Sequence, residues 1–377
     1  MSATAVPVPS RLPSLTGLRF VAAATVVAQH SSMIWSADGD ESATWLRLSF
    51  AGVSFFFLLS GFLLAWAWEP GQAAATFWRR RAARVYPTHL VTLLAGLLLV
   101  EATGRRAATG GWLPQVFLVQ TWSPHFDLMD PGVNGVSWSL CCEAAFYLSF
   151  PLFGRWIAAV PARLLWPCAA ATAGTIMALP ALVTALRPLL GSGPTFGYFP
   201  VSLGQMWLSY AFPPSRLPEF LLGVLLARLV REGRARGVRL WHGALAFTLV
   251  YPLDERAPLL FGIAAATVVP LCLLLLGGAA ADLRGARTAL GHPVARRLGE
   301  LSFALYMSHY LVIVYGCHLL DPAHAGGPLG RTLVTLLLLA VSAAAAWLLH
   351  TAVEKPWMRR LGGPRRWPAA RPSETSG

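Results

Sequence analysis

The chain has 377 residues, of which 55% are hydrophobic and 12% are charged, and it contains 15 tryptophans. Soluble globular domains carry about 25% charged residues, so this composition excludes that class and predicts a protein that crosses a membrane several times. The net charge of +13 does not indicate nucleic-acid binding, because the arginines lie in short clusters between apolar segments, as is expected of cytoplasmic loops.

The apolar segments predict an all-α, polytopic transmembrane bundle of about ten helices. In chain order, the expected spans lie near residues 17–36, 48–68, 87–103, 137–155, 164–186, 217–230, 239–253, 258–281, 300–320 and 332–352. Residues 1–14 are expected to form a flexible cytoplasmic arm, residues 15–360 one transmembrane domain, and residues 361–377 a disordered cytoplasmic tail. With the N-terminus inside, most of the 30 basic residues are cytoplasmic, so both termini are predicted to be cytoplasmic.

The first span, LTGLRFVAAATVVAQHS, carries Arg19 and His30 among apolar residues. At about 100° per residue, eleven steps bring the two side chains to within about 20° of each other on one helix face, roughly 16 Å apart along the axis. An ionisable group at membrane depth indicates a functional site. The alternative for His30 is a core histidine that is hydrogen-bonded to a neighbouring helix.

The segment FWRRRAARVYP, at residues 77–87, places Arg81 and Arg84 three positions apart, so they share a face if this segment begins the third helix. A guanidinium group can donate two parallel hydrogen bonds to phosphate oxygens. The two arginines are therefore a candidate site for a phosphate-bearing cosubstrate such as a nucleotide or coenzyme A. The alternative is that the cluster only keeps this loop on the cytoplasmic side.

Two later spans also carry polar side chains. In VSWSLCCEAAFYLSFP, Ser139 and Tyr147 flank Glu143 at four-residue spacing, and a carboxylate inside a span must be paired, hydrogen-bonded or protonated. In GELSFALYMSHYLV, helical spacing aligns Ser302, Tyr306 and His309. Structural hydrogen bonds between helices are the alternative interpretation of both groups. Glu354, in VEKPW, is expected at the cytoplasmic end of the last span, where it would balance nearby arginines.

Together these segments resemble acyltransferase family 3, the integral membrane proteins that include bacterial O-antigen and exopolysaccharide O-acetylases and macrolide O-acyltransferases. The resemblance covers nearly the whole chain. Six segments carry it in family order: TGLRFVAAATVVAQH with its Arg-x10-His spacing, GVSFFFLLSGFLLA, FWRRRAARVYP, WSLCCEAAFY, LGELSFALYMSHY and VEKP.

The resemblance implies a multi-pass enzyme of the inner (plasma) membrane. It would move an acetyl or other short acyl group from cytoplasmic acyl-CoA, a cosubstrate, to a hydroxyl of a sugar, glycoconjugate or glycosylated natural product. No permanently bound cofactor and no metal are expected. His30 would be the general base and Glu143 a second catalytic residue. The residues expected to bind acyl-CoA are Arg19, Arg81 and Arg84, and those expected to bind the acceptor are Trp138, Ser139, Tyr147, Tyr306 and His309.

Several alternatives stay open at this point. Glu143 could orient the His30 imidazole or bind the acceptor hydroxyl, and direct transfer and an acyl-enzyme are both compatible with the sequence. A transporter or flippase of lipid-linked sugars could use His30 and Glu143 to relay protons or to bind substrate, although the sequence shows no convincing inverted repeat. The oligomeric state, including a homo-oligomer, is left open.

Overall fold

The computed structural model describes residues 12–32, 34–35, 42–68, 71–104, 111–129, 131–190, 193–197, 199–321 and 327–361. The all-α prediction is confirmed. The longer helices are α1 (Pro13–Ser32), α2 (Ser42–Ala67), α3 (Ala74–Thr103), α5 (Trp138–Ala159), α6 (Leu165–Ala185), α8 (Pro213–Arg231), α9 (Leu240–Arg256), α11 (Val268–Leu283), α12 (Pro293–Leu320) and α13 (Pro328–Leu349). Each of them overlaps one of the predicted spans.

Six helical segments of the described chain are long and apolar enough to cross a bilayer, which needs about 20 residues. They are Trp45–Ala67, Ala74–Thr103, Gly135–Ala159, Ala162–Ala185, Pro293–Leu320 and Pro328–Leu361. The other four helices, α1, α8, α9 and α11, are shorter or more polar. The protein is therefore a multi-pass membrane protein, whereas the cytoplasmic location of its termini stays a prediction.

Two helices, α1 and α3, begin earlier in the chain than predicted. Helix α1 begins at Pro13, so the last two residues of the predicted arm are helical; there the Ser14 hydroxyl donates to Asp282 Oδ1 at 2.6 Å. Residues 1–11 of the arm and the tail beyond Leu361 lie outside the described residues. Helix α3 begins at Ala74, so the arginine segment is part of a continuous helix.

The remaining connections contain short helical elements. The predicted eighth span is divided into α10 (Leu259–Gly262) and α11, and α13 continues through a π-helical turn, His350–Glu354, into α14 (Lys355–Leu361). The connections before α5 and α8 contain α4 (Leu113–Val116), α7 (Leu203–Met206), a π-helical turn (Trp207–Ala211) and 3-10 turns at Gln120–Trp122 and Gly135–Ser137.

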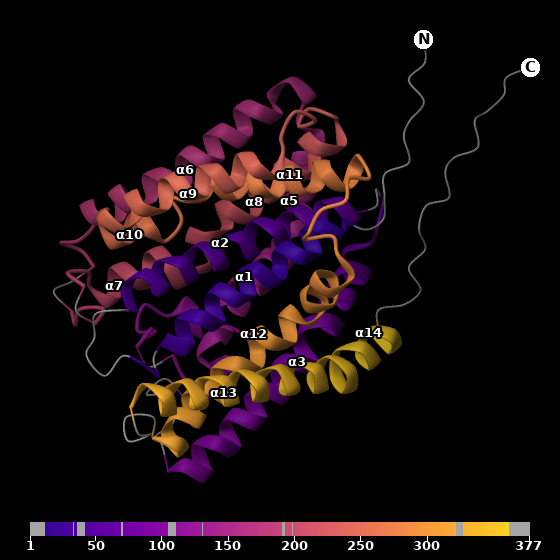
Figure 1. The fold of residues 1–377 in the computed structure, drawn as a ribbon. Coiled ribbons are helices and arrows are strands. Elements are labelled where there is room, and N and C mark those ends of the chain that lie inside the picture. The colour runs from indigo at the N-terminus through magenta and orange to yellow at the C-terminus, as the bar shows by residue number, and fades with distance from the viewer. Residues whose placement is uncertain are drawn as a thin grey trace, which may run out of the picture.

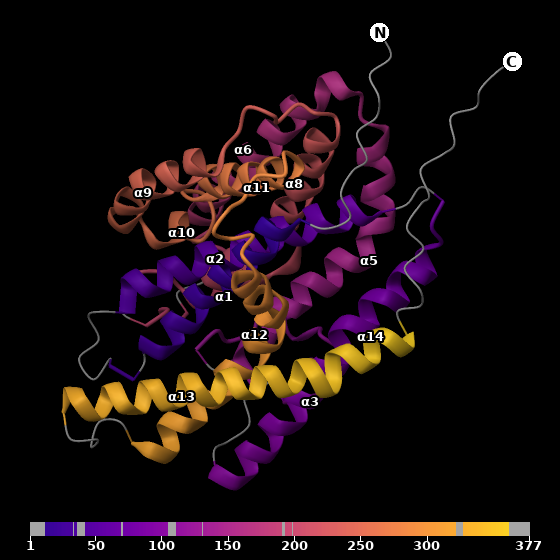
Figure 2. The same cartoon turned by 45° about the vertical axis from the view of Figure 1, so that its right-hand side comes forward.

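Helices α1 and α2 pack side by side through the middle of the molecule (Figures 1 and 2). On one side of them lie α6, α8, α9 and α11, and on the other lie α3, α12, α13 and α14. Helix α8 packs on α2, and α12 packs on α1. Both polar residues that the sequence singles out in the first span are therefore carried by a central helix.

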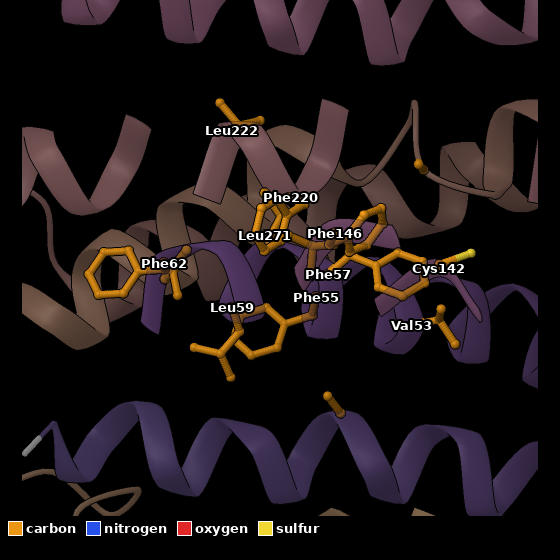
Figure 3. Packing of buried hydrophobic residues seen from close by; sticks show 14 of the residues in the cluster. Val53, Phe55, Phe57, Leu59, Phe62, Cys142, Phe146, Phe220, Leu222 and Leu271 are labelled. Carbon is orange, nitrogen blue, oxygen red and sulfur yellow. The ribbon is translucent and has the colours of Figure 1, made fainter. Parts of the chain in front are cut away.

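Aromatic side chains and glycines fix the contact between α2 and α8. The rings of Phe57, Phe146 and Phe220 meet at this contact (Figure 3), with ring centroids 5.2 Å apart for the first pair and 5.0 Å for the second. A Cβ atom on Gly61 would overlap the Phe220 carbonyl, and one on Gly223 would overlap a carbonyl of α2. Small residues allow helix backbones in membranes to approach closely, so these glycines set the spacing of the core.

Candidate active site

Two histidines meet where α1 packs against α12. Nδ1 of His30 lies 3.1 Å from Nε2 of His309 and 3.1 Å from the carbonyl oxygen of Val26. Nδ1 of His309 lies 3.0 Å from the carbonyl oxygen of Leu305. The ring of Tyr310 stands edge-on to His30, with centroids 5.1 Å apart. The first span therefore holds its histidine against the histidine of the ninth span.

The hydrogen-bond partners assign the tautomer of each ring. A carbonyl oxygen can only accept, so both Nδ1 atoms carry the proton in the neutral pair. Nε2 of His309 then accepts from Nδ1–H of His30, and the unprotonated nitrogen of His30 is Nε2. Among the described residues, the hydrogen-bond contacts of the His30 ring are all made at Nδ1. His309 is fully buried, whereas His30 is partly accessible.

Ser139 and Tyr306 lie next to the histidine pair. The Tyr306 and His309 rings have centroids 5.9 Å apart, and the Tyr306 hydroxyl is 2.8 Å from Ser139 Oγ. Ser139 Oγ also donates to the Val136 carbonyl at 3.0 Å. Trp138 packs against Tyr210 in the core, with ring centroids 4.3 Å apart. Ser139, Tyr306 and His309 thus form one group, and Trp138 lies in the aromatic core beside it.

Glu143 lies with the arginines and not with His30. The Tyr147 hydroxyl donates to Glu143 Oε2 at 2.7 Å, and the charges of Arg19, Arg84 and Arg81 act on the Glu143 carboxylate. The hydrogen-bond contacts of the His30 ring within the described residues are with Val26 and His309, so Glu143 does not contact the imidazole there. The interpretation of Glu143 as the group that orients His30 is therefore not supported, because His309 fills that position.

The arginine cluster also includes Glu354 and His350, and the sequence indicated only the first of them. Nη2 of Arg84 lies 4.0 Å from Oε1 of Glu354, and Oε2 of Glu354 lies 2.8 Å from Nδ1 of His350. The Glu354 charge also acts on Arg19. The expectation that Glu354 balances nearby arginines agrees with its contact to Arg84, and the carboxylate is also buried, with a side-chain exposure of 1%. The four-residue spacing of His350 and Glu354 was the available signal.

A groove of about 560 Å³ is lined mainly by residues of α1, α12 and α13, and neither His30 nor His309 is among its lining residues. Its walls include Ala24, Ala28, Ser31, Leu305, Thr335 and Ala343. Ser31 follows His30 in the chain, and Leu305 provides the carbonyl that accepts from His309. The walls are mostly apolar, and the hydroxyls of Ser31 and Thr335 donate to carbonyls of their own helices.

Two further ion pairs are buried in the described part of the chain, away from both groups. Arg47 of α2 contacts Asp254 of α9 at 3.2 Å. Arg216 contacts Glu219 at 3.1 Å within α8, donates to Ser54 of α2 at 3.0 Å, and lies over the Phe57 ring. Both pairs connect α2 to the half of the molecule that holds α8 and α9, so we regard them as structural.

The family model described as "Acyltransferase domain" matches residues 12–351, nearly the whole chain. The chain belongs to this acyltransferase family. It is 41% identical over 378 residues to Acyltransferase MdmB of Streptomyces mycarofaciens, covering 96% of this chain and 94% of that protein. These findings make the protein a membrane acyltransferase of the O-acyltransferase type.

More distant relatives agree with the family. Nodulation protein 10 of Rhizobium leguminosarum bv. viciae is 28% identical over 323 residues, covering 78% of this chain and 81% of that protein. A putative peptidoglycan O-acetyltransferase, YrhL, of Bacillus subtilis is 26% identical over 379 residues, covering 92% of this chain and 54% of that protein. No solved structure matches the chain significantly.

Proposed function

We propose that the protein transfers an acetyl or other short acyl group from acyl-CoA to a hydroxyl of a sugar, glycoconjugate or glycosylated natural product, in the plasma membrane. One observation carries the proposal. Helix α1 holds Arg19 in a cluster of arginines at one position and His30 in a pair of imidazoles eleven residues further on. The first group is suited to an anionic donor and the second to deprotonating a hydroxyl.

The donor would bind through its phosphates to Arg19, Arg81 and Arg84. Guanidinium forks hold phosphate oxygens bidentately. The long, linear pantetheine arm would then extend along α1 and bring the thioester to His30. Tyr306 would lie on this route, because its ring contacts His309 and the charge of Glu143 acts on its hydroxyl.

The reaction needs one base that later acts as an acid. The acceptor hydroxyl oxygen attacks the thioester carbonyl carbon while its proton moves to Nε2 of His30, so that a C–O bond forms. When the C–S bond breaks, the imidazolium returns the proton to the departing thiolate, and the products are an ester and free coenzyme A. His309 keeps Nδ1 of His30 as the donor throughout, which leaves Nε2 for proton transfer.

The acceptor would approach His30 from the groove between α1, α12 and α13. Two lining residues are close to the pair: Ser31 follows His30 in the chain, and the Leu305 carbonyl accepts from His309. The apolar walls suit the non-sugar body of a glycosylated natural product. A free polysaccharide would need more hydrogen-bonding groups than these walls offer.

The test is the release of coenzyme A thiol by purified protein in nanodiscs. Wild-type protein is supplied with acetyl-CoA and longer acyl-CoAs together with sugar and glycoside acceptors, and the products are identified by mass spectrometry. We expect ester formation by the wild type, loss of it in His30→Ala, and normal activity in His318→Ala, a histidine at the exposed end of α12. If folded wild type consumes no thioester with any acceptor but moves a lipid-linked sugar, the protein is a transporter and the proposal is wrong.

A further inference from the structure

The last long helix changes its neighbour at an irregular turn. Helix α13 packs on α12, whereas α14 packs on α3, and the two are joined by the π-helical turn His350–Glu354 (Figure 2). A π-helical turn bonds each N–H to the carbonyl five residues back, so it holds one residue more than an α-helical turn and rotates the helix that follows. Such turns occur often at functional sites. The turn His350–Glu354 places Glu354 against α3, beside Arg84.

The two oxygens of the Glu354 carboxylate have different partners. Oε2 is 2.8 Å from His350 Nδ1, a direct hydrogen bond within the turn. Oε1 is 4.0 Å from Arg84 Nη2, too far for a hydrogen bond, and the Glu354 charge also acts on Arg19. The carboxylate is thus fixed by His350 and attracts the arginines without using their donors.

If this ion pair served only stability, its charged groups would be expected to form direct hydrogen bonds, because the cost of desolvating two buried charges is recovered only with good hydrogen-bond geometry. Here the Glu354 side chain is 1% exposed and the Arg84 side chain is 28% exposed, and the two charged groups remain 4.0 Å apart without a hydrogen bond. Within the described part of the chain, the Arg84 guanidinium is left with its hydrogen-bond donors unused. It is therefore held in place electrostatically and remains ready to donate to an added anion.

We propose that Glu354, fixed by His350, is a positioning residue that holds Arg84 and Arg19 in the arrangement that receives the phosphate groups of the acyl donor. This inference rests on the proposed function for the identity of the donor. It assigns a role to two residues outside the reacting centre, because His350 and Glu354 act on the arginines and not on His30.

The test compares donor binding with turnover in Glu354→Gln, which keeps the size of the side chain and removes its charge. We expect KM for acyl-CoA to rise about 10- to 100-fold, the effect of one charge-assisted contact, while kcat and KM for the acceptor change less than about twofold. Glu354→Asp should recover part of the donor affinity. The matched control is Glu232→Gln, in the Arg228–Glu232 pair whose glutamate is exposed, and it should leave every constant unchanged.

Binding of unacylated coenzyme A, measured by calorimetry on the same variants, separates this inference from the proposed function. If wild type binds coenzyme A and Glu354→Gln binds it at least tenfold more weakly, the positioning role holds even where no acyl transfer is detected. If Glu354→Gln lowers only kcat, or if it lowers the melting temperature and Glu354→Asp restores neither affinity nor turnover, the inference is wrong. If wild type does not bind coenzyme A, the inference also fails.

Discussion

The assignment of His30 and not His309 as the base can be tested by removing His309. In His309→Phe a ring of similar size replaces the imidazole, and Nδ1–H of His30 loses its acceptor at 3.1 Å. The carbonyl of Val26, also at 3.1 Å, remains as a second acceptor and keeps the same tautomer. The variant therefore loses one hydrogen bond from a base that is otherwise intact.

The size of the effect follows from this remaining contact. One hydrogen bond contributes about 0.5–1.5 kcal/mol, and about 1.4 kcal/mol corresponds to a tenfold change. We therefore expect kcat of His309→Phe to fall roughly 2- to 12-fold. His30→Ala removes the proposed base itself and should lower kcat by about 100- to 10,000-fold. The double variant should be no slower than His30→Ala, because residues that act as a unit are not additive.

The kcat values of His309→Phe and His30→Ala are measured as initial rates of thiol release at saturating acyl-CoA and acceptor. Gel filtration and melting temperature in detergent establish that the variants are folded. If His309→Phe is as slow as His30→Ala, or if His30→Ala keeps most of the wild-type rate, the tautomers are assigned wrongly. His309 would then be the base.

Two predictions concern stability. Gly223→Val should destabilise the protein by about 1–3 kcal/mol or more, measured as a lower melting temperature in detergent, because its Cβ would overlap a carbonyl of α2. Gly174→Val on α6, where a Cβ meets nothing within 4 Å, is its control, and equal losses would contradict the packing argument. Arg47→Met should lower the free energy of unfolding by about 3–5 kcal/mol, because it leaves the Asp254 carboxylate buried and unpaired. The double variant with Asp254→Leu should recover much of this stability, and no recovery would mean that the unpaired charge is not the cause.

The helices could be predicted because their signal is local. Apolar length and periodicity place each span, but the arginines of FWRRRAARVYP lower the hydropathy there, so the third span was predicted to begin at residue 87. Helix α3 begins at Ala74 because arginine and alanine are good helix formers whatever their hydropathy. The boundary of a helix and the boundary of the membrane are different properties, and the sequence pattern mainly reports the second.

The partners across helices could not be predicted in the same way. Helical spacing brought Arg19 and His30 to one face, but the partner of His30 is 279 residues away in the chain. The spacing of Glu143 and Tyr147 predicted their contact within α5, but it did not predict that the Arg19 charge of α1 would act on the Glu143 carboxylate. Contacts of this kind depend on how helices are rotated against one another, which a single sequence does not encode locally.

The separation of the two groups along α1 has an electrostatic consequence for catalysis. In the proposed reaction an imidazolium would form at His30 when the hydroxyl loses its proton, and nearby positive charge would oppose it. At roughly 16 Å and an effective dielectric constant of about 20, one arginine opposes it by only about 1 kcal/mol, compared with about 4 kcal/mol at 4 Å. Glu143 and Glu354 offset part of that remaining repulsion, because their charges lie beside Arg19. Under the proposed mechanism, the chain could therefore gather several arginines for an anionic donor and still keep His30 an effective base, provided that the two carboxylates stay with the arginines and not with the imidazole.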